Sequence, residues 1–121
     1  EAVAGRKEDN MRVVDVMAKE ILEETGITVR PDEIRLLNHG FPLTTTPGMT
    51  NEVIYLGITE LSYAQMAQVA KRAGLAEEGE STEVVFLSFD DLDNYWADLK
   101  TFALIQYLKY ELLRRETRRV R

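Results

Sequence analysis

The stretch that decides the fold covers residues 13–27 and reads VVDVMAKEILEETGI. Five of its apolar residues recur at the three- and four-residue spacing of one helix face: Val13, Val14, Met17, Ile21 and Leu22. Gly26 follows the last of these positions, as is typical of a glycine that ends a helix. The pattern therefore predicts an amphipathic helix over residues 13–25.

The residues that follow this helix favour strands. Residues 27–29 predict a short strand, residues 31–32 a turn, and residues 33–38 a second strand. Residues 40–50 hold two of the three prolines and predict a loop, because proline cannot continue either element. Residues 52–59 are nearly all apolar and β-prone, which is the pattern of a central strand buried on both faces.

The second half of the chain alternates between helix and strand patterns. Ser62 and Gln65 have the spacing of a capping box and open a predicted helix that stops at Gly74. Residues 76–81 predict a loop, residues 83–89 a strand, and Ser88 with Asp91 the start of the next helix. A final helix over residues 100–115 carries an apolar stripe of Phe102, Leu104, Ile105, Leu108, Leu112 and Leu113. Helices alternating with strands indicate an α/β or α+β layered domain.

Composition narrows the classes of function. The 121 residues include 21 Asp plus Glu, 15 Lys plus Arg, one His and no Cys, for a net charge of −6. The absence of Cys excludes disulfide scaffolds, thiolate zinc sites and a cysteine nucleophile, and a single His excludes multi-histidine metal sites. The negative balance argues against nucleic-acid binding. No membrane span or signal peptide is recognisable, so we expect a cytoplasmic protein without a membrane partner.

The basic end of the chain contrasts with this acidic balance. Residues 114–121 contain five Arg and one Glu. Two interpretations stay open for them: a solvated helix end whose cations complement the helix dipole, or a contact with phosphate or nucleic acid.

Three carboxylates in the first helix are the main candidates for chemistry. Glu20, Glu23 and Glu24 stand three and four positions apart, so they project from one stripe of the helix. By spacing alone this is either a solvated acidic face or a ligand set for a hard divalent cation such as Mg²⁺.

The wider sequence resembles the motif of the Nudix hydrolases, G-x5-E-x7-R-E-U-x-E-E-x-G-U, where U is apolar. Seven positions fall in register with it: Gly5, Glu20, Ile21, Glu23, Glu24, Gly26 and Ile27. Residues 1–5, 47–52 and 74–80 are similar to segments of the branch that hydrolyses ADP-ribose and nucleotide sugars. Two positions depart from the motif, because Met11 replaces its first Glu and Lys19 its Arg.

The resemblance implies a fold, a reaction and a set of site residues. The implied fold is a Nudix-like α/β/α sandwich with a mixed sheet whose N-terminal strands are missing here, with a catalytic domain over residues 1–115 and a basic tail over residues 116–121. The implied reaction is Mg²⁺-dependent hydrolysis of the pyrophosphate bond of a nucleotide sugar of the ADP-ribose, ADP-glucose or UDP-glucose type, with Mn²⁺ as an alternative ion. A homodimer is also expected.

The residue roles come from the same resemblance. The metal ligands would be the Ala4 carbonyl, Glu20 and Glu24, with Glu23 as a further ligand or as the group that holds the attacking water. The catalytic base would be Glu78 or Glu80. Met11 and Lys19 leave a second interpretation open, a weakly active or inactive nucleotide-binding or scaffold domain. A third interpretation, which the motif spacing disfavours, is an acidic helical adaptor without a ligand.

Overall fold

The computed structural model describes residues 1–69, 83–94 and 98–120. The chain divides into two units, one of residues Val3–Val84 and one of Glu1–Ala2 with Val85–Arg121. Helices combine with two small antiparallel ladders, so the fold class is mixed α+β.

Helix α1 (Val13–Thr25) organises the larger unit and confirms the predicted helix. Gly26 adopts φ 77° after it, and its N–H donates to the Leu22 carbonyl at 2.9 Å. The inward face of α1 packs on a buried cluster of Ile27, Val29 and Ile34. The partly buried apolar residues against this cluster are Val14, Met17, Ala18, Ile21, Leu61 and Val69.

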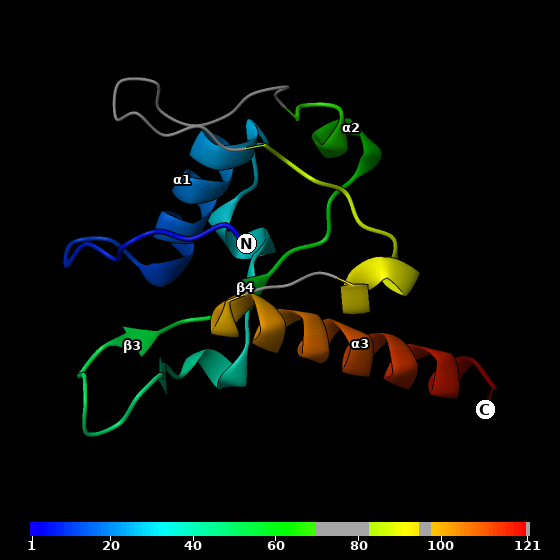
Figure 1. Ribbon diagram of the computed structural model, residues 1–121. Coiled ribbons are helices and arrows are strands. Elements are labelled where there is room, and N and C mark those ends of the chain that lie inside the picture. Colours follow the sequence, from blue (N-terminus) through cyan, green and yellow to red (C-terminus); the bar gives the residue numbers. More distant parts are fainter. Residues whose placement is uncertain (70–82, 95–97, 121) are drawn as a thin grey trace. The chain divides into compact units, whose positions relative to one another are not determined.

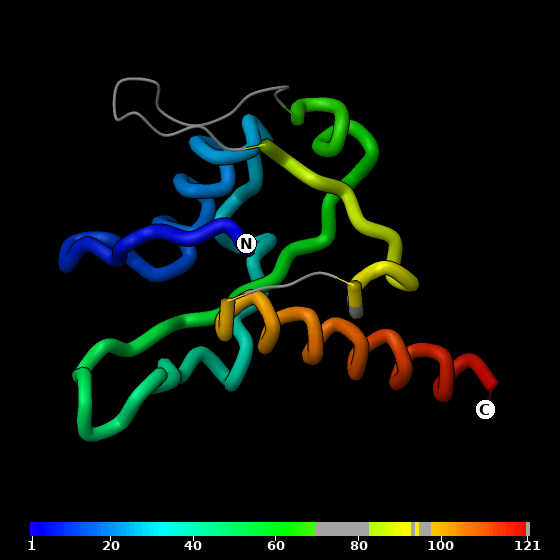
Figure 2. The backbone as a smooth tube through the Cα atoms, viewed as in Figure 1, coloured from blue at the N-terminus to red at the C-terminus, as the bar shows by residue number. Residues whose placement is uncertain are grey.

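The strands of this unit form one interrupted hairpin. β1 (Arg35–Leu36) pairs antiparallel with β4 (Gly57–Ile58), and β2 (Leu43–Thr44) pairs antiparallel with β3 (Val53–Ile54). Between the two ladders, the longer segment of residues 37–42 lies opposite the shorter segment of residues 55–56. The extra residues of the longer segment form the turn η2 (Asn38–Gly40). Figure 1 shows β3 and β4 along one returning segment, and Figure 2 traces the loop that joins β2 to β3.

The hairpin corrects two predictions. The expected central strand over residues 52–59 is wrong as a single element, because its two ends belong to different ladders and Val53 is 49% exposed. Residues 37–42 lie opposite only residues 55–56, so the ladder cannot continue between β3 and β4. Residues 40–50 were expected to be loop only, yet Leu43 and Thr44 form β2.

The predicted strand over residues 27–29 is also wrong. Ile27 and Val29 are buried and Thr28 is exposed, as in a strand, but no ladder forms there. Two glutamine side chains take the place of a partner strand: the Thr28 N–H donates to Gln68 Oε1 at 2.8 Å, and Gln65 Nε2 donates to the Thr28 carbonyl at 3.1 Å. Backbone groups of a single extended segment are thereby paired without a neighbouring strand.

Both glutamines follow a confirmed helix start. In α2 (Tyr63–Met66) the Ser62 side chain accepts from the Gln65 N–H, and the Gln65 side chain accepts from the Ser62 N–H, which is the predicted capping box. The helix predicted to reach Gly74 is wrong in its length, because α2 ends at Met66 and residues 67–69 are not helical. Residues 70–74, and the loop predicted over residues 76–81, fall outside the described residues.

The second unit is dominated by α3 (Leu99–Val120). It confirms the predicted final helix and extends beyond it, so the expected boundary after residue 115 falls inside α3. Asp98 precedes the helix and accepts hydrogen bonds from the N–H groups of Lys100 and Thr101 at 2.9 and 3.1 Å. These bonds, above all the one from Thr101, hold the pKa of the Asp98 carboxyl below its usual value.

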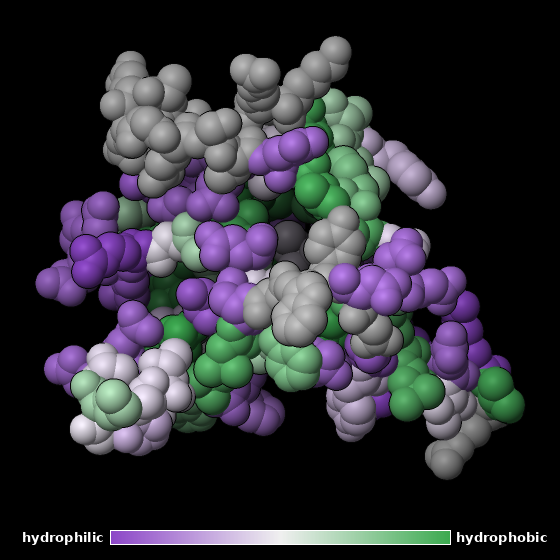
Figure 3. Space-filling view, in the orientation of Figure 1, coloured by the Kyte–Doolittle hydropathy of each residue, from purple (hydrophilic) through white to green (hydrophobic). Residues whose placement is uncertain are grey.

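The segment before α3 differs from its prediction. Residues 83–88 form no strand, which corrects the strand expected over residues 83–89. The helix start expected at Ser88 is a 3-10 helix, η4 (Phe89–Asn94). Ser88 directly precedes it, and Ser88 Oγ donates to Asp91 Oδ2 at 2.7 Å. In the described part of the chain, no helix is long and apolar enough to cross a bilayer. Polar groups and exposed apolar groups are interspersed on the face shown in Figure 3.

Candidate functional site

The three candidate carboxylates of α1 lie on a half-buried part of the helix. Glu20, Glu23 and Glu24 are all of intermediate exposure, whereas Leu22 in the same turn is 48% exposed. A solvated acidic face would show the reverse order, with the carboxylates outside and the leucine inside. This arrangement disfavours the interpretation of these residues as a purely solvated face.

Gly5 lies directly against Glu20, fifteen positions further along the chain. A Cβ at Gly5 would overlap Cγ and Cδ of Glu20 and stand 2.5 Å from its Oε1. Only a residue without a side chain allows this approach of the backbone to the carboxylate. The Ala4 carbonyl, one of the expected ligands, belongs to the peptide group that joins Ala4 to Gly5. The contact therefore brings two motif positions and this peptide group into one neighbourhood.

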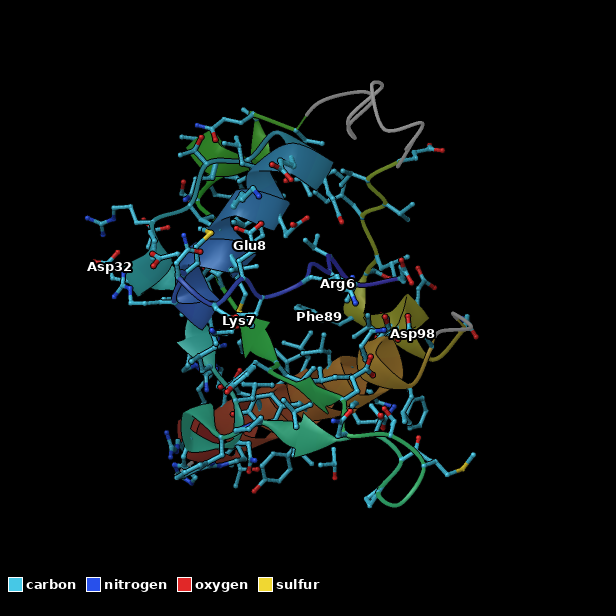
Figure 4. The ribbon with its side chains drawn as sticks, turned by 90° about the vertical axis from the view of Figure 1, so that its left-hand side faces the viewer. Arg6, Lys7, Glu8, Asp32, Phe89 and Asp98 are labelled. Carbon is cyan, nitrogen blue, oxygen red and sulfur yellow. The ribbon has the colours of Figure 1, made fainter. Side chains whose placement is uncertain are left out.

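The N-terminal segment reaches α1 without forming a strand. Residues 1–8 carry no regular element, and Met11 N donates to the Glu8 carbonyl at 3.1 Å just before the helix. Figure 4 shows Lys7 and Glu8 on this segment beside the start of α1. The helix itself begins with an ion pair in which Arg12 Nε and Nη2 each lie 2.9 Å from a carboxylate oxygen of Asp15.

The two positions that depart from the motif also have defined surroundings. Met11 is half-buried, so an apolar side chain occupies the place where the motif has a carboxylate. Lys19 Nζ lies 4.0 Å from Glu23 Oε1, one turn further along α1. The lysine side chain is 47% exposed, so this pair contributes little to stability. It does place a cation beside an expected member of the ligand set.

The C-terminal turn of α1 is held by Thr25, which the sequence interpretation did not single out. Its buried side chain donates from Oγ1 to the Ile21 carbonyl at 2.5 Å and accepts from the Ile27 N–H at 3.1 Å. These two bonds join the last helical turn to the segment after Gly26 and fix the backbone beside Glu24. A threonine directly before a helix-ending glycine was the available sequence signal.

A second polar cluster surrounds the Glu33 carboxylate. Gln65 Nε2 donates to Glu33 Oε2 at 3.0 Å, and Arg30 Nε lies 3.1 Å from Glu33 Oε1. The hydrogen bond from Gln65, with the Arg30 guanidinium next to it, holds the pKa of the Glu33 carboxyl below its usual value. Asp32 on η1 (Pro31–Glu33) is directed outward in Figure 4. All these groups have partners within the cluster, so it is structural.

The carboxylates of α1 are the type of ligand that a hard cation prefers. Glu20 and Glu24 offer oxygen ligands, and Mg²⁺ is commonly held by one or two carboxylates together with waters and substrate phosphates. Within residues 1–69, 83–94 and 98–120, no group of three or more His, Asp or Glu side chains could enclose a metal ion. Glu78 and Glu80, the expected source of the catalytic base, lie outside the described residues. The described donors thus suit an open two-carboxylate site.

Comparisons of the chain with protein-family models, with curated proteins and with solved structures found no match. Any assignment of function therefore depends on the chain's own residues and their geometry.

Proposed function

We propose that this protein is a Nudix-type hydrolase that cleaves the pyrophosphate bond of a nucleoside diphosphate sugar and releases a nucleoside monophosphate and a sugar phosphate. The observation that carries the proposal is the contact between Gly5 and Glu20. The motif defines both positions at a fixed separation, and a contact this close is a reason for the motif to require glycine. The half-buried position of Glu23 and Glu24 on the same helix adds support.

The chemistry assigned to the chain follows from the charge of the substrate. A bound Mg²⁺ would neutralise charge on the phosphate oxygens and lower the pKa of a water molecule. In this proposal Glu20 and Glu24 would hold the ion together with the Ala4 carbonyl. Glu23 would hold the water, because the described side chains form no group of three carboxylates that could enclose a metal ion. Glu78 or Glu80 would serve as the base that takes the proton of that water. No thiol or imidazole is needed, which agrees with a chain of no Cys and one His.

The finer fold belongs to the same proposal. We infer a Nudix-like α/β/α sandwich, to which α1, α3 and the two short antiparallel ladders would contribute. The helices and the antiparallel strand pairs agree with this sandwich only at the level of a mixed α+β class.

One observation favours a second candidate, a weakly active or non-catalytic nucleotide-binding domain. Lys19 stands next to Glu23, and the half-buried Met11 removes the carboxylate that the motif pairs with its arginine. A lysine lacks the planar fork with which arginine fixes a carboxylate at two points. Glu20 would then be held less rigidly, and nucleotide binding could persist with little turnover.

A Mg²⁺ titration with ADP-ribose, ADP-glucose and UDP-glucose tests the proposal by the release of nucleoside monophosphate. We expect turnover in the parent protein and a loss of at least about 100-fold in Glu24→Gln, which removes one charged ligand. Asp15→Asn is the matched control, because Asp15 lies in the first turn of the same helix and bonds to Arg12 instead. It should leave turnover unchanged.

The outcomes separate the two candidates. If no substrate is hydrolysed faster by the parent than by Glu24→Gln, the hydrolase proposal is wrong. Should nucleotide then still raise the melting temperature in a Mg²⁺-dependent way that Glu24→Gln abolishes, the binding domain is the better assignment. If neither Mg²⁺ nor Mn²⁺ shifts the melting temperature, the remaining interpretation is the acidic helical adaptor that binds no ligand.

A further inference from the structure

The N-terminal segment of the chain is held at two points by side chains that are distant in sequence. At the first point, the Ala2 N–H donates to Thr101 Oγ1 at 2.8 Å, across 99 positions of the chain. At the second point, Gly5 lies against Glu20. The residues between these points form no regular element, so no ladder restrains them. The two contacts therefore hold the short stretch that includes Ala4, whose carbonyl is an expected metal ligand.

A carboxylate orients the hydroxyl group that receives this N–H. Thr101 Oγ1 lies 3.1 Å from Asp98 Oδ2, and Asp98 lies just before α3 (Figure 4). The pKa of the Asp98 carboxyl is lowered, chiefly by the hydrogen bond from the Thr101 N–H, so at neutral pH the carboxylate can only accept. The single hydroxyl hydrogen of Thr101 is therefore donated to Asp98. The oxygen lone pairs are left to accept the N–H of Ala2.

The support for these bonds is the capped first turn of a long helix. Asp98 Oδ1 accepts the N–H groups of Lys100 and Thr101, so the same carboxylate caps α3 and orients the threonine hydroxyl. A capped helix turn is a more rigid support than a segment without regular structure. Ala2 belongs to the same unit as this turn, whereas Ala4 belongs to the larger unit. The link between Ala2 and Ala4 is the chain itself.

We propose that Thr101 is a positioning residue for the candidate metal site, because its hydrogen bond to Ala2 fixes the segment that presents the Ala4 carbonyl to the ion. This inference rests on the proposed function, which makes that carbonyl a ligand. Thr101 acts through Ala2 and needs no contact with the ion. A segment that is already held at two points loses less conformational freedom when its carbonyl binds an ion, so the affinity for the ion is higher.

Thr101→Val tests this role, because it removes the hydroxyl group at nearly constant volume. We expect the amide hydrogen of Ala2, followed by nuclear magnetic resonance, to exchange at least about tenfold faster, since its acceptor is lost. The Mn²⁺ dissociation constant, measured by electron paramagnetic resonance, should rise about 3- to 10-fold. This is less than the effect of losing a direct partner of a ligand, because Ala2 is two residues from Ala4. Thr101→Ser keeps the hydroxyl group and should restore both values.

Thr117→Val is the matched control on the same helix. Thr117 Oγ1 donates to the Leu113 carbonyl at 3.0 Å, so this variant also removes a threonine hydroxyl and one hydrogen bond from α3. It leaves the Ala2 N–H and its acceptor in place, and both the Mn²⁺ dissociation constant and the Ala2 exchange rate should stay at the parental values. Urea unfolding measures the stability of both valine variants. A purely structural role of Thr101 would lower stability and leave the Mn²⁺ affinity unchanged.

The results distinguish this inference from the proposed function. If the parent protein binds Mn²⁺, then parental Mn²⁺ affinity or parental Ala2 exchange in Thr101→Val overturns the positioning role alone. Equal weakening of Mn²⁺ binding in Thr117→Val overturns it too, as does a Thr101→Ser variant that binds Mn²⁺ no better than Thr101→Val. A parent protein that binds no Mn²⁺ overturns the proposed metal site and the positioning role with it, even where Ala2 exchange depends on Thr101.

Discussion

Gly5→Ala probes the proposed site most directly. The new Cβ would overlap two carbons of the Glu20 side chain and stand 2.5 Å from Oε1, closer than non-bonded atoms approach. The φ of Gly5 is not positive, so the backbone accepts alanine and the side chain of Glu20 must move. Because that side chain is flexible, we expect a loss of less than about 1.5 kcal/mol in the free energy of unfolding.

The effect on the metal should be much larger than the effect on stability. A methyl group that displaces a ligand by about 1 Å reduces metal affinity or activity by roughly 10- to 100-fold. Mn²⁺ binding followed by electron paramagnetic resonance measures the affinity without requiring turnover. The Mg²⁺ dependence of monophosphate release provides the second readout.

Gly57→Ala is the matched control for this prediction. A Cβ at Gly57 would stand 2.8 Å from Met17 Sδ and 3.2 Å from Ile34 Cγ2, both in the packed interior of the same unit. Overpacking of this kind lowers the free energy of unfolding by about 1–3 kcal/mol. Its metal affinity should stay at the parental value. Parental Mn²⁺ affinity in Gly5→Ala would refute the reasoning, as would equal losses in the two variants.

Three further predictions concern stability, each measured by urea unfolding. Gln65→Ala should lower the free energy of unfolding by about 1–3 kcal/mol, because the bonds to Thr28, Glu33 and the helix start are lost together; parental stability would contradict this role. The pKa of the Glu33 carboxyl is lowered in the folded state, so its ionised form stabilises the fold at pH values above its usual pKa of 4.5. This stabilisation is lost as the pH falls through the folded-state pKa, so Glu33→Gln should reduce the loss of unfolding free energy at acid pH. His39→Gly should raise stability by about 1 kcal/mol, because His39 has φ 56°; a decrease would indicate side-chain contacts that matter more than the backbone.

Local sequence signals predicted the elements whose causes are local. The helical spacing and Gly26 predicted both ends of α1, and the capping box predicted the start of α2. Each of these signals depends on residues within one or two helical turns of each other, so it can be recognised without the rest of the chain. Asp98 was missed because a capping residue lies outside the apolar pattern that it precedes.

Strand pairing was harder to predict because its partners are distant in sequence. Apolar residues over 52–59 indicated one strand, but the turn η2 puts more residues on one side of the hairpin than on the other. The ladder therefore breaks between β3 and β4. Residues 27–29 have the alternation of a strand, yet their partners are Gln65 and Gln68, and no local pattern reveals such a substitution.

The candidate site shows the same division. The sequence by itself determined that Glu20, Glu23 and Glu24 share one stripe of α1, because helix geometry relates residues three and four apart. Only the tertiary structure decided that Gly5 packs on Glu20 and that Leu22 is more exposed than the carboxylates. Burial and close approach depend on which distant segments the chain brings together, and periodicity along one helix does not specify them.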